Sequence, residues 1–132
     1  MSFDYRNMYS TNQAVCNAGD EWSDDNLDHG ATDRRMSVSG ELALRMIVTE
    51  AFTDMASGMR VVLKDDAVNT FNSGTLKEHT SSPVLLPAQL TLGAEFNFPL
   101  SDLALQQYSK VYYVPISQNA TAGKVTVGLV IR

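Results

Sequence analysis

The sequence predicts an all-β protein, built as an antiparallel sandwich or barrel of about eight short strands. From Glu41 onward, apolar and polar residues alternate with a period of two, which is typical of half-buried strands. The gaps between these runs carry residues that favour turns, at 57–58, 72–74, 92–93 and 119–123. Helical segments of the kind that a doubly wound fold needs are absent from the pattern.

The individual strands are expected where the alternation is clearest: Leu42–Val48, Met59–Lys64, Phe96–Leu100 and Val125–Ile131. A further run, Val111–Val114, is apolar on both faces and is therefore expected to be a central strand. Its two tyrosines, Tyr112 and Tyr113, should point to opposite faces. Only Leu100–Gln107 could form a helical turn or two, with Ser101 as its N-cap.

The 132 residues fit one domain. We expect an N-terminal arm over residues 1–11 and a single β-sandwich domain over residues 12–132. The arm has apolar side chains in no clear period, which favours an extended segment lying on a neighbouring molecule. A first strand folded back on the body is an equally good interpretation of the same residues.

The net charge of −5 and the pI of about 4.8 argue against nucleic acid as a direct partner. A nucleic-acid-binding protein usually carries a basic patch, whereas the ten Lys and Arg residues here are scattered. No apolar stretch approaches the ~20 residues that span a bilayer, and the first residues contain no apolar segment of a signal peptide. Synthesis in a cytoplasm and no contact with membrane are therefore expected.

The sequence contains no motif that indicates an enzyme, a cofactor site or a metal site. The single cysteine, Cys16, cannot form an intrachain disulfide and is expected to be a small core residue. His29 and His79 lie in polar, loop-like sequence. No catalytic, cofactor-binding or metal-binding residue is predicted, although dispersed pairs of carboxylates remain an open possibility.

Residues 20–33 hold six of the fifteen acidic residues. An EF-hand reading that starts at Asp24 fails, because its glycine and glutamate positions are occupied by His29 and Arg35. A solvated loop or a polar edge strand is the expected structure, with another kind of cation site as the alternative. Trp22 lies inside this stretch, where it either closes the end of the core or serves as a contact for a partner.

The order of several segments resembles the jelly-roll capsid cement (decoration) proteins of tailed bacteriophages, typified by the one on a Bordetella podophage. The resemblance spans about Asn12 to Ile131. It is carried by Asn12–Val15, by Val48–Thr53 and above all by Thr121–Val130. The chain departs from the family pattern in its acidic stretch and in the aromatic arm before Asn12.

The resemblance implies a jelly-roll-like sandwich on the outer face of a virion capsid, without catalysis and without a cofactor. It implies the major capsid protein as partner, a homo-oligomer (dimer or trimer), and stabilisation of contacts between capsid subunits. We expect five residues to contact the partner: Phe3, Tyr5, Arg6, Tyr9 and Trp22. Deleting residues 1–9 should then leave a folded domain that decorates shells poorly. A carbohydrate- or protein-binding β-sandwich module on a phage surface is the alternative.

Overall fold

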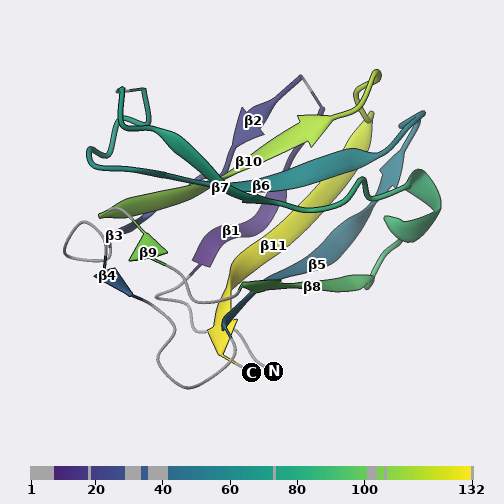
Figure 1. Ribbon diagram of the computed structural model, residues 1–132. Coiled ribbons are helices and arrows are strands. Elements are labelled where there is room, and N and C mark those ends of the chain that lie inside the picture. The colour runs from purple at the N-terminus through teal and green to yellow at the C-terminus, as the bar shows by residue number, and fades with distance from the viewer. Residues whose placement is uncertain are drawn as a thin grey trace.

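The computed structural model describes residues 8–17, 19–28, 34–35, 42–72, 74–100, 104–105 and 107–131. They form two packed antiparallel sheets and a small additional ladder (Figure 1). The elements in chain order are β1 Met8–Ala14, β2 Glu21–Trp22, β3 Leu27–Asp28, β4 Arg34–Arg35, β5 Leu42–Thr53, β6 Met59–Asp66, β7 Lys77–Ser81, a 3₁₀ turn Pro87–Gln89, β8 Glu95–Leu100, β9 Ala104–Leu105, β10 Tyr108–Pro115 and β11 Ala122–Ile131.

The strand pairing is nested, as in one long hairpin. The outermost pair is β1 with β11, followed by β2 and β3 with β10, then β5 with β8, and finally the hairpin β6–β7. Rolling up this hairpin brings β11 beside β5 and β10 beside β6. The resulting orders, β1-β11-β5-β8 (sheet A) and β2-β10-β6-β7 with β3 also on β10 (sheet B), are those of a jelly roll. The predicted fold class is confirmed.

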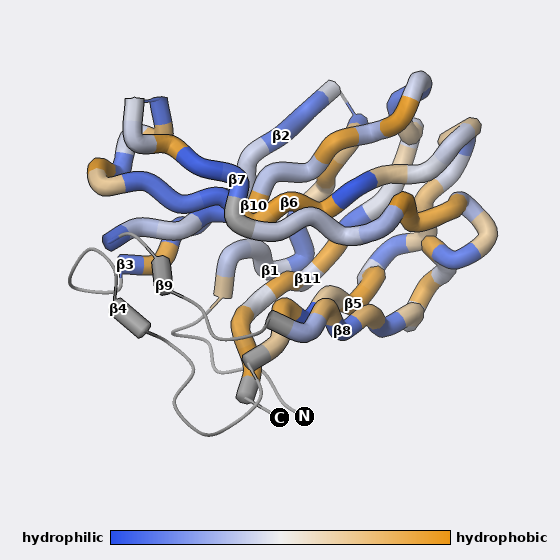
Figure 2. Tube along the Cα trace, in the orientation of Figure 1, coloured by the Kyte–Doolittle hydropathy of each residue, from blue (hydrophilic) through white to orange (hydrophobic). Residues whose placement is uncertain are grey.

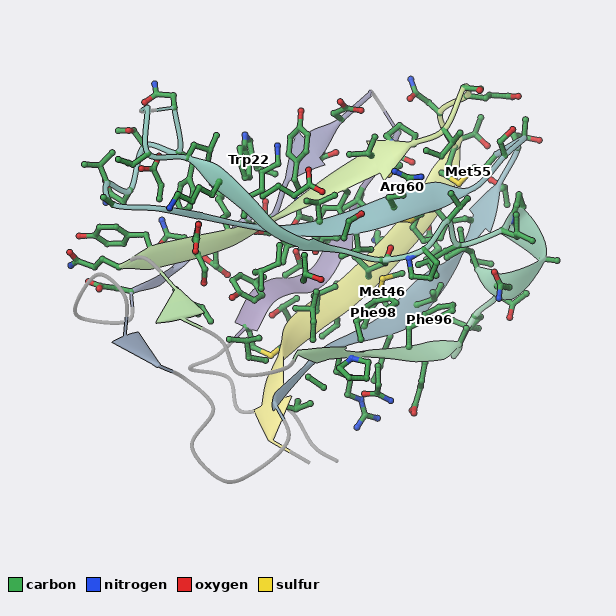
Figure 3. The ribbon with its side chains drawn as sticks, in the orientation of Figure 1. Trp22, Met46, Met55, Arg60, Phe96 and Phe98 are labelled. Carbon is green, nitrogen blue, oxygen red and sulfur yellow. The ribbon has the colours of Figure 1, made fainter. Side chains whose placement is uncertain are left out.

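The core lies between the two sheets, and the predicted alternation places its residues. Leu44, Met46 and Val48 of β5 are buried on the inner face, and Val125, Val127 and Leu129 of β11 lie beside them. Phe96 and Phe98 of β8 pack against this core (Figure 3). Figure 2 shows hydrophobic segments in orange along β5 and β11, and hydrophilic segments in blue at the end of sheet B where β6 connects to β7.

The first strand corrects the predicted boundary of the arm. β1 begins at Met8, so residues 8–11 belong to the sandwich rather than to an arm. Tyr9 is fully buried, and its hydroxyl lies 2.7 Å from the Ser109 Oγ on the opposite sheet. The prediction that Tyr9 contacts a partner is therefore wrong, because its ring is part of the core. Phe3, Tyr5 and Arg6 lie outside the described residues.

This burial changes the expected outcome of N-terminal deletion. Removing residues 1–7 leaves β1 intact, whereas removing residues 1–9 also removes the Tyr9 ring and its hydrogen bond to Ser109. We expect the second deletion to lower the free energy of unfolding by about 3 kcal/mol more than the first, as for the loss of a buried aromatic side chain. Urea denaturation of the two truncated chains measures the difference. Equal stabilities would contradict a structural role for Tyr9.

Two further local predictions fail because pairing between distant segments overrides local sequence preference. The loop-like sequence around His79 forms the edge strand β7, residues 77–81, on β6. The helical turn that the sequence allows over residues 100–107 is not found in the described part of that segment. Leu100 ends β8 opposite Leu42, and Ala104–Leu105 pairs with Arg34–Arg35. Within the described parts of the chain, no helix is long and apolar enough to cross a membrane.

Candidate interaction site

Trp22 lies on the outer face of sheet B. In the ladder between β2 and β10, Trp22 is directly opposite Tyr112, and opposite residues share a face of the sheet. Tyr113 is fully buried in the core while Tyr112 is only half-buried. The prediction that these two tyrosines point to opposite faces is confirmed, and the central position of β10 between β2 and β6 is confirmed with it.

The buried side chain of Gln13 fixes the position of β2. Its Nε2 donates to the Trp22 carbonyl oxygen at 3.0 Å, and its Oε1 accepts from the Asp24 backbone N–H at 2.8 Å. Gln13 belongs to β1 of sheet A, so these bonds join an edge of one sheet to an edge of the other. The backbone at Trp22 is therefore held by the hydrogen bond from Gln13 of sheet A as well as by its pairing with β10.

A buried hydroxyl network supports Gln13 in turn. The Ser10 hydroxyl donates its one hydrogen to the Gln13 Oε1 at 2.6 Å, so the Tyr113 hydroxyl, 2.7 Å from the Ser10 Oγ, must be the donor of that second bond. Ionised Tyr113 could not donate it. Burial raises the pKa of Tyr113 far above its usual value, which keeps the hydroxyl protonated and the network intact.

Two aromatic rings and two lysines gather around Trp22, and we call the five residues the aromatic–lysine patch: Trp22, Phe71, Tyr112, Lys64 and Lys110. The Trp22 ring lies 4.6 Å from the Tyr112 ring and 5.5 Å from the Phe71 ring, centroid to centroid. The Nζ of Lys64 is 4.3 Å from the Tyr112 ring centroid. Both ammonium groups approach the Trp22 centroid, Lys64 to 5.4 Å and Lys110 to 5.6 Å.

Phe71 reaches the patch from the connection between β6 and β7, and its ring packs against that of Trp22, which Figure 3 labels. Its backbone has a left-handed φ of 54°. The connection is held by Asp66, whose carboxylate accepts from the Thr75 hydroxyl at 2.6 Å and from the Val68 N–H at 3.3 Å. The Trp22 ring therefore packs on the outer face of sheet B and does not close the end of the core. It remains half-exposed, and its contact with a partner stays a prediction.

The two lysines give the patch an unusual charge arrangement. Lys64 and Lys110 are directly opposite on β6 and β10, where like charges repel one another. No ion pair is recorded for either lysine within the described residues. Cation–π contacts with the rings below offset the repulsion, at about 0.5–1 kcal/mol for an exposed contact. The two ammonium groups are bordered by two acidic residues: Asp20, whose carboxylate accepts from the Tyr112 hydroxyl at 3.4 Å, and Glu78, which is opposite Lys64 on β7.

A second exposed surface lies at the opposite end of the sandwich (Figure 1). The connection from β7 to β8, residues 82–94, contains no charged residue. Its Leu86 and Leu92 side chains are 54% and 70% exposed, and we call this pair the leucine tip. The connection is anchored by paired backbone bonds between Leu85 and Met59, of 2.8 and 3.0 Å, and by the Gly93 N–H to the Val48 carbonyl at 2.9 Å.

The other candidate groups give no site. The part of the acidic stretch that the structure describes, 20–28, contributes β2 and β3 at the edge of sheet B, which confirms a polar edge strand. No cluster of three or more metal-binding side chains occurs among the described residues. Cys16 is buried as predicted, and burial raises the pKa of its thiol to about 12, so it is not an activated nucleophile.

The sequence identified Trp22 but not the surface around it. Phe71 comes from a turn, and no periodicity links a turn residue to a strand on another part of the chain. Lys64 was the last residue of a predicted alternating strand, but Lys110 preceded the predicted run 111–114, and their pairing required the register between β6 and β10. The like-charged pair follows once β6 and β10 are aligned in their observed register.

The model of the Bbp16 protein family matches residues 9–129, which run from the buried Tyr9 of β1 to Leu129 of β11. A search of the curated proteins found no match. The matched span therefore covers nearly the whole jelly roll that the structure describes.

Proposed function

Because the chain belongs to the Bbp16 family of Bordetella phage proteins, we propose that it is a capsid cement protein. In this role it binds the outer surface of a bacteriophage capsid and stabilises contacts between subunits of the major capsid protein. The family is one of phage structural proteins. The match over nearly the whole domain is the observation that carries the proposal.

The architecture supports this role. Two packed sheets joined by a buried polar network form a stiff body, and the aromatic–lysine patch and the leucine tip lie at opposite ends of it (Figure 1). A body with two separated contact surfaces can bridge two neighbouring subunits. Each contact can be weak, because binding at one end raises the effective concentration of the other. We propose no catalytic step and no cofactor for this protein.

The five residues expected to contact the partner have different positions in this proposal. Trp22 contributes through the aromatic–lysine patch, Phe3, Tyr5 and Arg6 stay predictions, and buried Tyr9 acts only by holding β1 in place. A homo-oligomer, dimer or trimer, also stays a prediction. A symmetric oligomer would multiply the contacts of each cement unit with the shell.

Co-sedimentation with emptied, undecorated heads tests the proposed function. Purified protein is titrated onto heads, and bound protein is quantified in the pellet. We expect saturable binding at a fixed ratio of protein to capsid subunit. Absence of binding would contradict the cement role and would favour a carbohydrate- or protein-binding module on the phage surface.

The leucine tip supplies a specific prediction. Replacing both exposed leucines, in Leu86→Ser/Leu92→Ser, should change the free energy of unfolding by less than about 0.5 kcal/mol, because neither side chain is buried in the core. The same variant should bind heads about tenfold more weakly if the leucines fill an apolar pocket on the shell. Ala88→Ser, which adds a hydroxyl to the same connection, serves as the control. Unchanged binding would remove the tip from the interface.

A further inference from the structure

We propose that the aromatic–lysine patch binds an acidic segment of the shell protein, with one or two carboxylates held between Lys64 and Lys110. This inference rests on the proposed function and names the chemistry of one contact within it. Three properties of the patch lead to it: its charge, its rigidity and the shape of its aromatic surface.

The charge of the patch is complementary to a carboxylate. Lys64 and Lys110 lie opposite each other with both ammonium groups within 5.6 Å of the centre of the Trp22 ring. A carboxylate placed between them replaces a repulsion with two attractions. The aromatic rings beneath exclude water from one side, so the attraction is stronger than between fully hydrated charges.

The patch is also organised before binding. Both lysines project from β6 and β10, which are central strands hydrogen-bonded on both sides. Trp22 is held through its backbone by Gln13, and Phe71 packs against its ring. Little conformational entropy is then lost when a ligand binds, apart from that of the lysine side chains. The aliphatic part of a glutamate can lie on the exposed part of the rings.

The geometry disfavours a sugar or a nucleic acid in this place. The Trp22 and Tyr112 rings are inclined by 52°, so they do not form one flat stacking platform, and the lysines lie over them. A nucleic acid extends well beyond two lysines and would meet the exposed Asp20, Asp24 and Asp25 nearby. A short acidic segment that binds at the two lysines meets fewer of these carboxylates, although Asp20 already accepts a hydrogen bond from the Tyr112 hydroxyl at 3.4 Å.

The first test uses Trp22 as a probe, because it is the only tryptophan of the chain. Tetraglutamate is titrated into the whole protein while tryptophan emission is recorded, with tetraglutamine and a neutral oligosaccharide as comparisons. We expect a saturable change with tetraglutamate alone, abolished in the variant Lys64→Gln/Lys110→Gln and weakened by added salt. A response to the oligosaccharide but not to tetraglutamate would overturn the proposal.

The second test places the patch in its biological setting. We expect Lys64→Gln/Lys110→Gln to bind emptied heads about tenfold more weakly and with a smaller dependence on salt concentration than the wild type. Lys77→Gln/Lys124→Gln removes the same charge from elsewhere on the protein and should behave as wild type. Denaturant melts establish that each variant is folded.

The outcomes of the second test separate the two proposals. If the wild type binds heads and Lys64→Gln/Lys110→Gln binds equally well with the same salt dependence, the patch proposal is overturned and the cement role stands. If the control variant loses as much affinity as the patch variant, net charge rather than the patch is responsible, and the proposal is again overturned. Failure of the wild type to bind heads overturns both.

Discussion

Alanine at position 58 is expected to destabilise the protein by about 3–5 kcal/mol, a large effect for the addition of one methyl group. Gly58 is buried, with a φ of +90°, and a Cβ at this position would overlap the carbonyl oxygen of Leu85. That oxygen belongs to the backbone and accepts from the Met59 N–H at 3.0 Å. Relief of the overlap would separate Leu85 from Met59 and release the connection that carries the leucine tip.

Two other glycines separate the causes of this effect. Gly93→Ala carries nearly the same backbone strain, with a φ of +83°, but its Cβ would meet nothing within 4 Å. It should cost about 1–2 kcal/mol. Gly74→Ala has open space and no positive φ, and should be close to neutral. Chemical denaturation of the three variants measures the costs. Equal losses for Gly58→Ala and Gly93→Ala would show that contact with Leu85 is unimportant.

The second large effect is a loss of stability in alkaline solution. Burial raises the pKa of the Cys16 thiol from 9.0 to about 12, and raises the pKa values of Tyr9 and Tyr113 well above their usual 10.0. Each group is neutral when protonated, so the folded state holds protons that the unfolded state releases first. The stabilisation is fully present below pH 9. It begins to fall as the pH rises past 9 for the thiol and past 10 for the phenols, and it is lost completely only when the pH exceeds the raised pKa of each group in the folded protein.

The expected size of this loss follows from proton linkage. Each group lowers the free energy of unfolding by up to about 1.4 kcal/mol per pH unit, and the three together by up to about 4 kcal/mol per unit above pH 10. Urea denaturation between pH 8 and pH 11 measures the slope. Tyr113→Phe should be less stable at pH 8, because Ser10 loses a bond, and should have a shallower slope above pH 10. A flat profile to pH 11 would contradict the burial of these groups.

Much of the fold follows from the sequence. Alternation alone placed β6 and β8 within two residues of their observed bounds. It also located β5 and β11, which extend beyond the predicted stretches, to Thr53 and back to Ala122, and the apolar run at 111–114 identified the central strand β10. These strands were predictable because each buries one face, or both, against the same core. The period of two arises because successive side chains of a strand point to opposite faces, so every second residue is buried.

The errors have a common physical cause. β1 and β7 are edge strands, and their hydrogen bonds to β11 and β6 come from partners far along the chain. β1 also contains two register shifts, which break the period and made Tyr9 look like part of an irregular arm. Register and long-range pairing are set by the whole fold, so local pattern does not reveal them.

The candidate site was only partly predictable for the same reason. Trp22 was identified because a lone tryptophan in polar sequence is unusual. Its neighbours Lys64, Phe71 and Lys110 come from three other parts of the chain, and they meet only after β10 has paired with both β2 and β6. The leucine tip was not predicted, because the sequence alone does not distinguish an exposed leucine from a buried one.

The central claim is that this protein reinforces a capsid, and heat disruption of the capsid tests it most directly. Emptied, undecorated heads are heated in a calorimeter alone and with saturating protein, and occupancy is verified by sedimentation. The account predicts a higher melting temperature for decorated shells, and a smaller increase when either the aromatic–lysine patch or the leucine tip is substituted. Fully occupied shells that melt at the temperature of bare shells would contradict it.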